Sequence, residues 1–426
     1  MKLIIHRGAQ GIEGNCIEIS TSTTRIILDA GLPLDDLGDS PRPRPRPGKA
    51  LPAGLAPIVP GLFGPGPKVD AILLSHAHAD HAGLLAFARK GIPILMSDGT
   101  RMMLKAASIF AGQPPLPQDQ LRIVGHRERF VIGDLTITAF PVDHSTFDCL
   151  AFVIDGDEKR VVYSGDLRLH GRKPGMAKRL LAALKERPVD VLLMEGTNII
   201  SEGRGPTEVE LEAELLDHIK SATRLVLASF SPLHVDRMVS FYKATRRAGR
   251  TLVVDLYGAF VLHLVNKRAS IPRPGIRNGI LVCYNQHFLR TWKRRNLAKI
   301  HDLFLRQRID LEAILAQPDR FVFLFRPSML DLDFGGRLPP ARCIYSYWHG
   351  YLQKPEWRRL ESVVKNAGGE FVKCHTSGHA FAKDLIGFGQ ACAAKRVVPI
   401  HTTGADKFRL RFRNVVQFSN GEIHSL

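Results

Sequence analysis

Histidine and aspartate residues crowd into one short turn of this sequence. An apolar stretch runs into Ser-His-Ala-His-Ala-Asp-His-Ala-Gly, so three imidazoles and one carboxylate fall within residues 76–81. Neutral imidazole and carboxylate are ligands that suit Zn²⁺, and four such groups crowd unfavourably unless a cation organises them. His76 and His78 alternate along one edge of the turn, while Asp80 and His81 lie on its next part. We therefore predict two adjacent metal ions rather than one.

Two ions need more ligands, and the ends of later apolar stretches offer them. His144 stands in Pro-Val-Asp-His-Ser, Asp166 in Ser-Gly-Asp and His401 in Pro-Ile-His-Thr. A carboxylate has two oxygens and can hold two cations about 3.5–4 Å apart, so Asp166 is the natural bridge. Each of these residues alone would more often be a surface residue or a satisfied core residue. Together with the turn they predict a metal centre; the alternative is a polar loop that happens to hold three histidines.

Composition bounds the class of protein. The chain has 426 residues, 45% hydrophobic and 23% charged, which is enough for two or three globular domains. Lysine and arginine number 59 against 41 acidic residues, and the net charge of +18 predicts attraction to polyanions. Six cysteines without a Cys-x-x-Cys pair are too sparse for a disulfide framework or a thiolate zinc site. With no apolar leader and no span of about 18 apolar residues, we expect a cytoplasmic protein that does not bind membranes.

The elements that must position these residues are short strands mixed with helices, which indicates an α/β or layered α+β core. In the N-terminal half we predict strands at 2–5, 16–19, 24–28, 71–74, 135–140, 150–154, 160–163 and 189–194, and helices at 82–90, 99–111 and 176–186. Between them, residues 41–69 form a Pro- and Arg-rich segment without an acidic residue. It is either a basic arm near a polyanion or a surface insertion.

A second domain begins after residue 205. Thr207 followed by Glu210 predicts a capping box and a helix over 208–221. Strand–helix units then alternate, including a basic helical stretch that runs to Arg308, in the pattern of a parallel α/β domain. We place the domain boundaries at residues 1–205, 206–355 and 356–426, with the last segment completing the first domain.

The motifs in chain order resemble the metallo-β-lactamase fold in its β-CASP nuclease branch, of the ribonuclease J and cleavage-and-polyadenylation endonuclease type. They are Asp29 in Ile-Leu-Asp-Ala-Gly, the cluster at 76–81, His144, Asp166, Glu195 in Met-Glu-Gly-Thr, His379 in Thr-Ser-Gly-His-Ala, and His401. The cluster identifies only the superfamily, whereas Glu195, His379 and His401 around an inserted domain point to the branch. The resemblance implies an α/β fold, a metallo-β-lactamase αββα sandwich with an inserted parallel α/β β-CASP domain.

The resemblance also assigns roles to single residues. It implies a first zinc on His76, His78 and His144. It implies a second zinc on Asp80, His81 and His401, with Asp166 as the bridge. The catalytic residues it implies are His379, which reaches the scissile phosphate, and Glu195, its acidic partner. We also expect Asp80 to be catalytic, because Asp80 or Asp166 can accept a hydrogen bond from the attacking water and aim it.

Two of the assignments have ordinary structural alternatives. Asp29 matches an aspartate that orients the cluster without binding metal, but it is equally a turn residue before Gly31. Glu195 could also be a strand-end carboxylate that backbone amides satisfy.

The implied function is a zinc-dependent ribonuclease, cutting internally, from the 5′ end or both. It would hydrolyse RNA phosphodiester bonds by a metal-bound hydroxide and leave 5′-phosphate and 3′-hydroxyl ends. Two Zn²⁺ are expected, with Mn²⁺ or Mg²⁺ as substitutes. RNA is preferred over DNA because RNA-processing members carry histidine at the position of His401. We expect no C-terminal domain of the ribonuclease J type after Leu426.

We expect single-stranded RNA as the partner, and a homodimer is left open. Substrate contacts are predicted for Lys293, Arg294 and Arg295, which are otherwise a solvated helix face, and for Ser377 and Gly378, which are otherwise a tight turn. Alternative functions are a hydrolase of DNA or of a small ester or thioester, and a catalytically silent RNA-binding subunit. The charge and the inserted domain argue against a small substrate, and the full set of seven ligands argues against a silent subunit.

Overall fold

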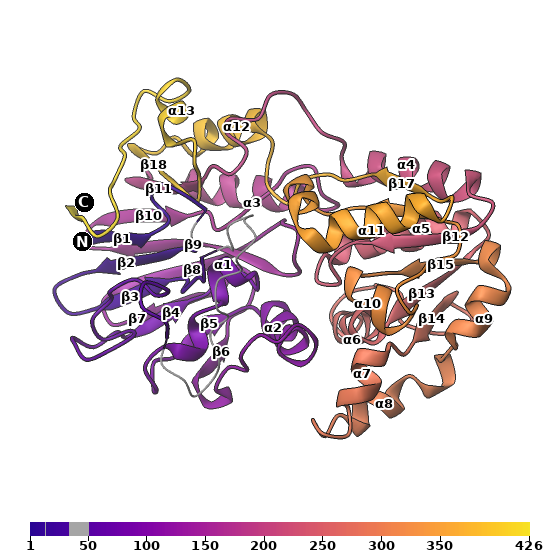
Figure 1. The fold of residues 1–426 in the computed structure, drawn as a ribbon. Coiled ribbons are helices and arrows are strands. Elements are labelled where there is room, and N and C mark those ends of the chain that lie inside the picture. Colours follow the sequence, from indigo (N-terminus) through magenta and orange to yellow (C-terminus); the bar gives the residue numbers. More distant parts are fainter. Residues whose placement is uncertain (13, 34–50) are drawn as a thin grey trace. The chain divides into compact units, whose positions relative to one another are not determined.

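The computed structural model describes residues 1–12, 14–33 and 51–426 of the chain (Figure 1). It divides into two compact units. Among the described residues, the first unit contains 1–12, 14–33, 51–205 and 378–426, and the second, inserted unit contains 206–377. The first ten residues of the Pro- and Arg-rich segment, 41–50, lie outside the described residues. Among the helices that are described, none combines the length and the apolar character that a membrane span requires.

The first unit contains two sheets. In spatial order the seven-stranded sheet is β19 (Ile423–Ser425), β1 (Lys2–Arg7), β2 (Cys16–Ser20), β3 (Arg25–Leu28), β4 (Ala71–Leu73), β5 (Ile94–Met96) and β6 (Leu121–Ile123). The six-stranded sheet is β18 (Arg396–Ile400), β11 (Val191–Glu195), β10 (Lys159–Tyr163), β9 (Cys149–Gly156), β8 (Leu135–Val142) and β7 (Arg129–Ile132). Its helices are α1 (Ala79–Ala82), α2 (Asp98–Phe110), α3 (Gly175–Leu184), α12 (Ala382–Cys392) and α13 (Ala405–Arg409).

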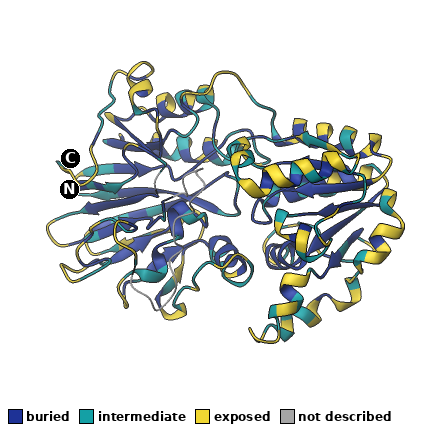
Figure 2. Cartoon of the chain, viewed as in Figure 1, coloured by how far each residue is buried: buried dark blue, intermediate teal, exposed yellow. Residues whose placement is uncertain are grey.

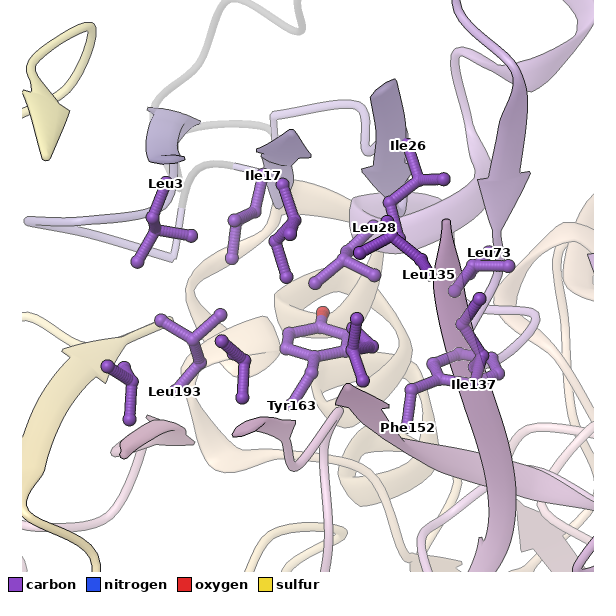
Figure 3. Packing of buried hydrophobic residues seen from close by; sticks show 14 of the residues in the cluster. Leu3, Ile17, Ile26, Leu28, Leu73, Leu135, Ile137, Phe152, Tyr163 and Leu193 are labelled. Carbon is purple, nitrogen blue, oxygen red and sulfur yellow. The ribbon is translucent and has the colours of Figure 1, made fainter. Parts of the chain in front are cut away.

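Alternating apolar residues of the two sheets meet in one core. Leu3 and Ile17 of the first sheet pack with Phe152, Tyr163 and Leu193 of the second, and all five are fully buried (Figure 3). A second apolar cluster on the other face of the six-stranded sheet joins it to helices α3, α12 and α13. Burying both faces of a sheet in this way produces the predicted layered sandwich of helices and sheets.

The inserted unit is a single parallel sheet with helices. In spatial order its strands are β14 (Ile280–Cys283), β13 (Thr251–Asp255), β15 (Phe321–Leu324), β12 (Leu225–Ser229), β16 (Ala341–Tyr345) and β17 (Glu370–Lys373). Its helices are α4 (Glu208–Ser221), α5 (Val235–Arg247), α6 (Leu256–Val265), α7 (Gln286–Thr291), α8 (Ala298–Leu303), α9 (Leu311–Ala316), α10 (Pro327–Leu332) and α11 (Pro355–Asn366). Strands β12 to β16 are mostly buried, the edge strand β17 is partly exposed, and the outer helix faces are exposed (Figure 2).

Three local expectations for the inserted unit have clear outcomes. The capping box is present, with Thr207 and Glu210 each bonding the other's backbone amide. The basic stretch is not one helix, because Asn296 has a left-handed backbone (φ 52°) between α7 and α8. The unit extends to Ser377 rather than to 355, because β17 pairs in parallel with β16 and completes the sheet.

Candidate metal centre

The histidine-rich turn joins β4 to α1 and is held in place by its neighbours. The carboxylate of Asp29 accepts hydrogen bonds from the Ser75 amide and hydroxyl, both at 2.7 Å. The Asn15 amide donates to the Asp80 carbonyl oxygen at 2.8 Å. A Cβ at Gly31 would lie 1.8 Å from that same oxygen, so only glycine fits there. These contacts hold the turn in a conformation that presents its side chains together.

Four predicted ligands form a first group. Potential ligand atoms of His76, His78, His144 and Asp166 all lie within 4.8 Å of one another. The Nδ1 atom of His78 is 3.1 Å from Nε2 of both His76 and His144. Asp166 Oδ2 lies 3.5 Å from His76 Nε2 and 3.6 Å from His144 Nε2. These distances suit a single ion between the four groups.

A second group contains Asp80, His81 and His401. His401 Nε2 is 3.1 Å from Asp80 Oδ2, and His81 Nε2 is 3.1 Å from Asp166 Oδ2. The other oxygen of Asp166 lies 3.7 Å from His401 Nδ1. The carboxylate of Asp166 therefore stands between the two groups, as a bridging ligand would. The structure thus brings all seven predicted ligands together from four separate segments of the chain.

Unsatisfied polar atoms show that this centre fits a cation. His81 Nε2 and both carboxylate oxygens of Asp166 are buried, and none makes a well-aligned hydrogen bond within the described part of the chain. Buried polar atoms of a folded protein are normally hydrogen-bonded, so these three atoms need another binding partner, such as a cation. Nitrogen and oxygen donors of this kind suit zinc and related divalent ions.

The protonation states of these side chains are also those expected of a cation site. Burial lowers the pKa of His76 and His144 well below the usual value and that of His78 to about 4, so these imidazoles are neutral. Burial opposes ionisation of Asp166, but His401 and His81 outweigh it and lower the pKa of the carboxyl. Burial also opposes protonation of His81, yet Asp166 and Asp29 raise its pKa. Without a metal, His81 thus carries the positive charge that a bound cation would replace.

Asp29, predicted to orient the cluster, has a supporting contact with Tyr163, and neither Tyr163 nor Thr197 was predicted from the sequence. Asp29 Oδ2 accepts hydrogen bonds from His81 Nδ1 at 2.6 Å and from the Tyr163 hydroxyl at 2.5 Å, so Asp29 orients His81. The Thr197 hydroxyl lies 3.0 Å from His401 Nδ1. Such contacts fix which nitrogen of each imidazole faces the metal. Tyr163 and Thr197 were detectable only as neighbours of the Ser-Gly-Asp and Met-Glu-Gly motifs.

Glu195 and His379 form a pair at the edge of the centre. His379 Nδ1 is 3.2 Å from Glu195 Oε1 and 3.9 Å from Asp166 Oδ2. Glu195 is fully buried and also accepts the Thr197 and Leu167 amides. Backbone amides thus satisfy part of this carboxylate, and its catalytic role beside His379 stays a prediction. Burial disfavours the charged imidazole, but Glu195 and Asp166 outweigh it and raise the pKa of His379 to about 9.

The residues predicted to contact substrate have different surroundings. The carbonyl oxygen of Gly378 accepts a hydrogen bond from His144 Nδ1 at 2.6 Å, which directs Nε2 of that ring into the first group. Lys293, Arg294 and Arg295 are exposed residues of the inserted unit between α7 and α8. Lys293 Nζ lies over the Trp292 ring, 5.5 Å from its centre. Substrate contact by these basic residues and by Ser377 stays a prediction.

Comparisons with known proteins agree with the fold. A family model described as a beta-lactamase superfamily domain matches residues 24–235. The chain is 30% identical over 202 residues to a Ribonuclease J of Corynebacterium glutamicum, a match that covers 44% of this chain and 28% of that protein. It is 21% identical over 269 residues to an RNase J-like protein of Methanocaldococcus jannaschii, covering 60% of this chain and 57% of that one.

Two longer matches span most of the chain. A Ribonuclease J 2 of Streptococcus pyogenes is 23% identical over 407 residues, covering 90% of this chain and 66% of that protein. A crystal structure of a protein of unknown function from Enterococcus faecalis superposes with a TM-score of 0.79. That superposition covers 100% of this chain and 99% of the other at 20% identity, and it shows the shared fold alone.

Proposed function

Because this chain belongs to the metallo-β-lactamase superfamily, with the inserted unit of its β-CASP ribonuclease J-like branch, we propose that it is a zinc-dependent ribonuclease. The observation that carries the proposal is the centre itself: seven imidazole and carboxylate ligands in two groups, with Asp166 between them and the Glu195–His379 pair beside them. Relatives named ribonuclease J and the net charge of +18 support RNA as the substrate.

The chain's own residues have distinct tasks in this reaction. When bound, two divalent ions lower the pKa of water and offset the negative charge that builds on a phosphate. Asp80 can accept a hydrogen bond from the attacking water and aim it at phosphorus. His379 directs Nδ1 toward Glu195, so Nε2 is the nitrogen that would donate to a phosphoryl oxygen or to the departing oxygen. The proposed products carry a 5′-phosphate and a 3′-hydroxyl.

The proposal is tested with an end-labelled single-stranded RNA beside the matching DNA. The purified protein is stripped with a chelator and reloaded separately with Zn²⁺, Mn²⁺ or Mg²⁺. We expect RNA products that disappear with the chelator and in an Asp80→Ala, His81→Ala double variant. Product lengths distinguish internal cutting from trimming at an end, and ligation of the products identifies the terminal groups.

Other outcomes would support the alternatives. If RNA and DNA stay intact with every metal while a small ester or thioester is hydrolysed, the chain is a small-substrate hydrolase. If RNA binds but no metal supports turnover, it is a silent binding subunit.

The predicted RNA contacts have a separate test. Replacing Lys293, Arg294 and Arg295 with alanine should weaken RNA binding and reduce the slope of log affinity against log salt by about 2. The matched control replaces Arg358, Arg359 and Lys365 on α11, which removes the same charge from the same unit. Equal effects of the two triple variants would mean that only net charge matters.

A further inference from the structure

We propose that the inserted unit holds a third metal site, built from Glu214, His218 and Cys374, that takes Zn²⁺. A carboxylate oxygen, an imidazole nitrogen and the thiol sulfur of these residues all lie within 4.8 Å of one another. The sequence contains no Cys-x-x-Cys pair, and this site needs none, because its ligands come from segments about 160 residues apart.

Two secondary-structure elements hold the three side chains in place. Glu214 and His218 are one turn apart on α4, so they share a face of that helix, with Glu214 Oε1 3.8 Å from His218 Nε2. Cys374 follows β17, and its amide donates to the Tyr345 carbonyl oxygen at 3.0 Å. Arg342 on the neighbouring β16 donates to the His218 carbonyl oxygen at 2.7 Å, which ties α4 to this edge of the sheet.

The donor set is one that zinc binds. Thiolate, imidazole and carboxylate are its usual protein ligands, and three of them with a water make a complete tetrahedral site. Such ligand atoms stand about 3.3–3.8 Å apart around a zinc ion, so modest side-chain rotation would close the present spacing. That rotation is available because the side chains of Glu214 and His218 are 45% and 30% exposed.

The thiol makes this site different from the catalytic centre. Cys374 is fully buried, and burial together with the Glu214 carboxylate raises the pKa of its thiol. The thiol is therefore protonated until a metal displaces the proton, and binding must release that proton. The two predicted catalytic groups contain only nitrogen and oxygen donors, whereas this site adds a soft sulfur ligand.

The site also lies beside both connections of the inserted unit. Cys374 is five residues before His379 in the chain. Between them, the Thr376 hydroxyl donates to the Pro206 carbonyl oxygen, and the Thr376 carbonyl accepts from Arg237 at 3.0 Å. A metal on Cys374 would hold this segment against α4 and so stabilise the end of the inserted unit that leads to His379.

Cobalt substitution tests the site without any RNA. Co²⁺ bound to a thiolate gives a charge-transfer absorption in the near ultraviolet that nitrogen and oxygen ligands do not give. Titrating the chelator-stripped full chain with Co²⁺ should produce this band, with a final intensity that corresponds to one thiolate-bound ion per chain, and Zn²⁺ should abolish it. The band should persist in the Asp80→Ala, His81→Ala double variant, which keeps the result independent of the proposed nuclease activity.

Single variants test which residues bind the metal ion and which results would contradict the proposed site. Cys374→Ser should lose the band, whereas Cys392→Ser, at another buried cysteine, should keep it. His218→Gln, a change on the surface of α4 that serves if Cys374→Ser fails to fold, should weaken Co²⁺ binding about 100-fold or more. A folded wild-type chain without the band at saturating Co²⁺ would overturn the proposal. Persistence of the band in Cys374→Ser would overturn it as well.

Discussion

Each of the two units buries a cluster of charged residues, and the two clusters differ in how the buried charges are compensated. In the inserted unit, the fully buried Arg237 donates to Glu208 at 2.9 Å and to the carbonyl oxygens of Ser346 and Thr376, both at 3.0 Å. Glu208 in turn accepts the Ser240 hydroxyl at 2.8 Å. In the other unit, both oxygens of the buried Asp166 have no well-aligned hydrogen bond within the described residues.

Burial and residue type alone do not separate these clusters. Both contain carboxylates, and both have a histidine nearby, since His234 Nε2 is 3.4 Å from Glu208 Oε1. They differ in which group supplies the positive charge and in whether hydrogen-bond donors reach the carboxylate oxygens. Arg237 supplies the charge and the donors in the inserted unit, so that network is complete and serves the fold. Around Asp166 the positive charge comes from imidazoles, which can give up a proton and bind a metal, and neither carboxylate oxygen has a well-aligned hydrogen bond within the described residues. This centre therefore suits a metal ion.

The largest expected effect comes from removing the carboxylate between the two ligand groups. Asp166→Asn should lower RNA cleavage on the order of 10⁴-fold, because metal ions contribute several kcal/mol to transition-state stabilisation. Metal content, measured by elemental analysis, should fall with it. A variant with normal activity and full metal content would show that Asp166 is not the bridge.

Breaking the complete network should affect folding instead. Arg237→Met leaves Glu208 buried without its cation and should cost about 3–5 kcal/mol of unfolding free energy. Denaturant melts of the inserted unit's transition measure this loss, and catalytic metals should not restore it. If added Zn²⁺ rescued the variant, the contrast between the two clusters would be wrong.

The pair at the edge of the centre should show an intermediate effect. Glu195→Gln removes the carboxylate beside His379 and should lower the turnover rate about 100-fold, the scale of a positioned proton donor. Metal content should stay unchanged, which separates this role from that of a ligand. Glu202→Gln, at an exposed position nearby in the chain, is the control and should have normal activity.

The smallest effect concerns an ion cluster that is neither a metal site nor fully enclosed. Glu18 accepts from Arg25 and lies 2.9 Å from His6 Nε2. Burial opposes its ionisation, but hydrogen bonds to His6 and Arg25 outweigh this and lower the pKa of Glu18 from 4.5 to about 2. A depressed carboxyl pKa stabilises the fold above pH 4.5, and the gain is lost as pH falls toward 2.

Glu18→Gln therefore should cost about 1–2 kcal/mol at pH 7. Urea denaturation of both proteins at pH 7, 5, 4 and 3 should show the difference shrinking as pH falls. A constant difference across this range would assign the loss to packing rather than to charge.

Features were predicted correctly from the sequence where the pattern that indicates them lies within a few consecutive residues. The turn at 76–81 and the capping box at Thr207 are local patterns, and the structure contains both. Prediction was wrong where a local pattern met a tertiary constraint. The basic stretch was predicted to be one helix, but the backbone is left-handed at Asn296. The domain boundary was predicted at residue 355, but β17 pairs with β16 and therefore belongs to the inserted sheet.

The sequence by itself determined which donors this protein offers: imidazole and carboxylate at the ends of apolar strands, and an excess of positive charge. Only the tertiary structure decided how they are used. It placed Asp166 between two ligand groups, set Tyr163 and Thr197 behind them, and brought Cys374 to Glu214 and His218. The physical reason is the distance along the chain between interacting residues. Helix caps and turns form between residues that are close in the sequence. Whether a buried charge finds its partner depends on segments that only the packed core brings together.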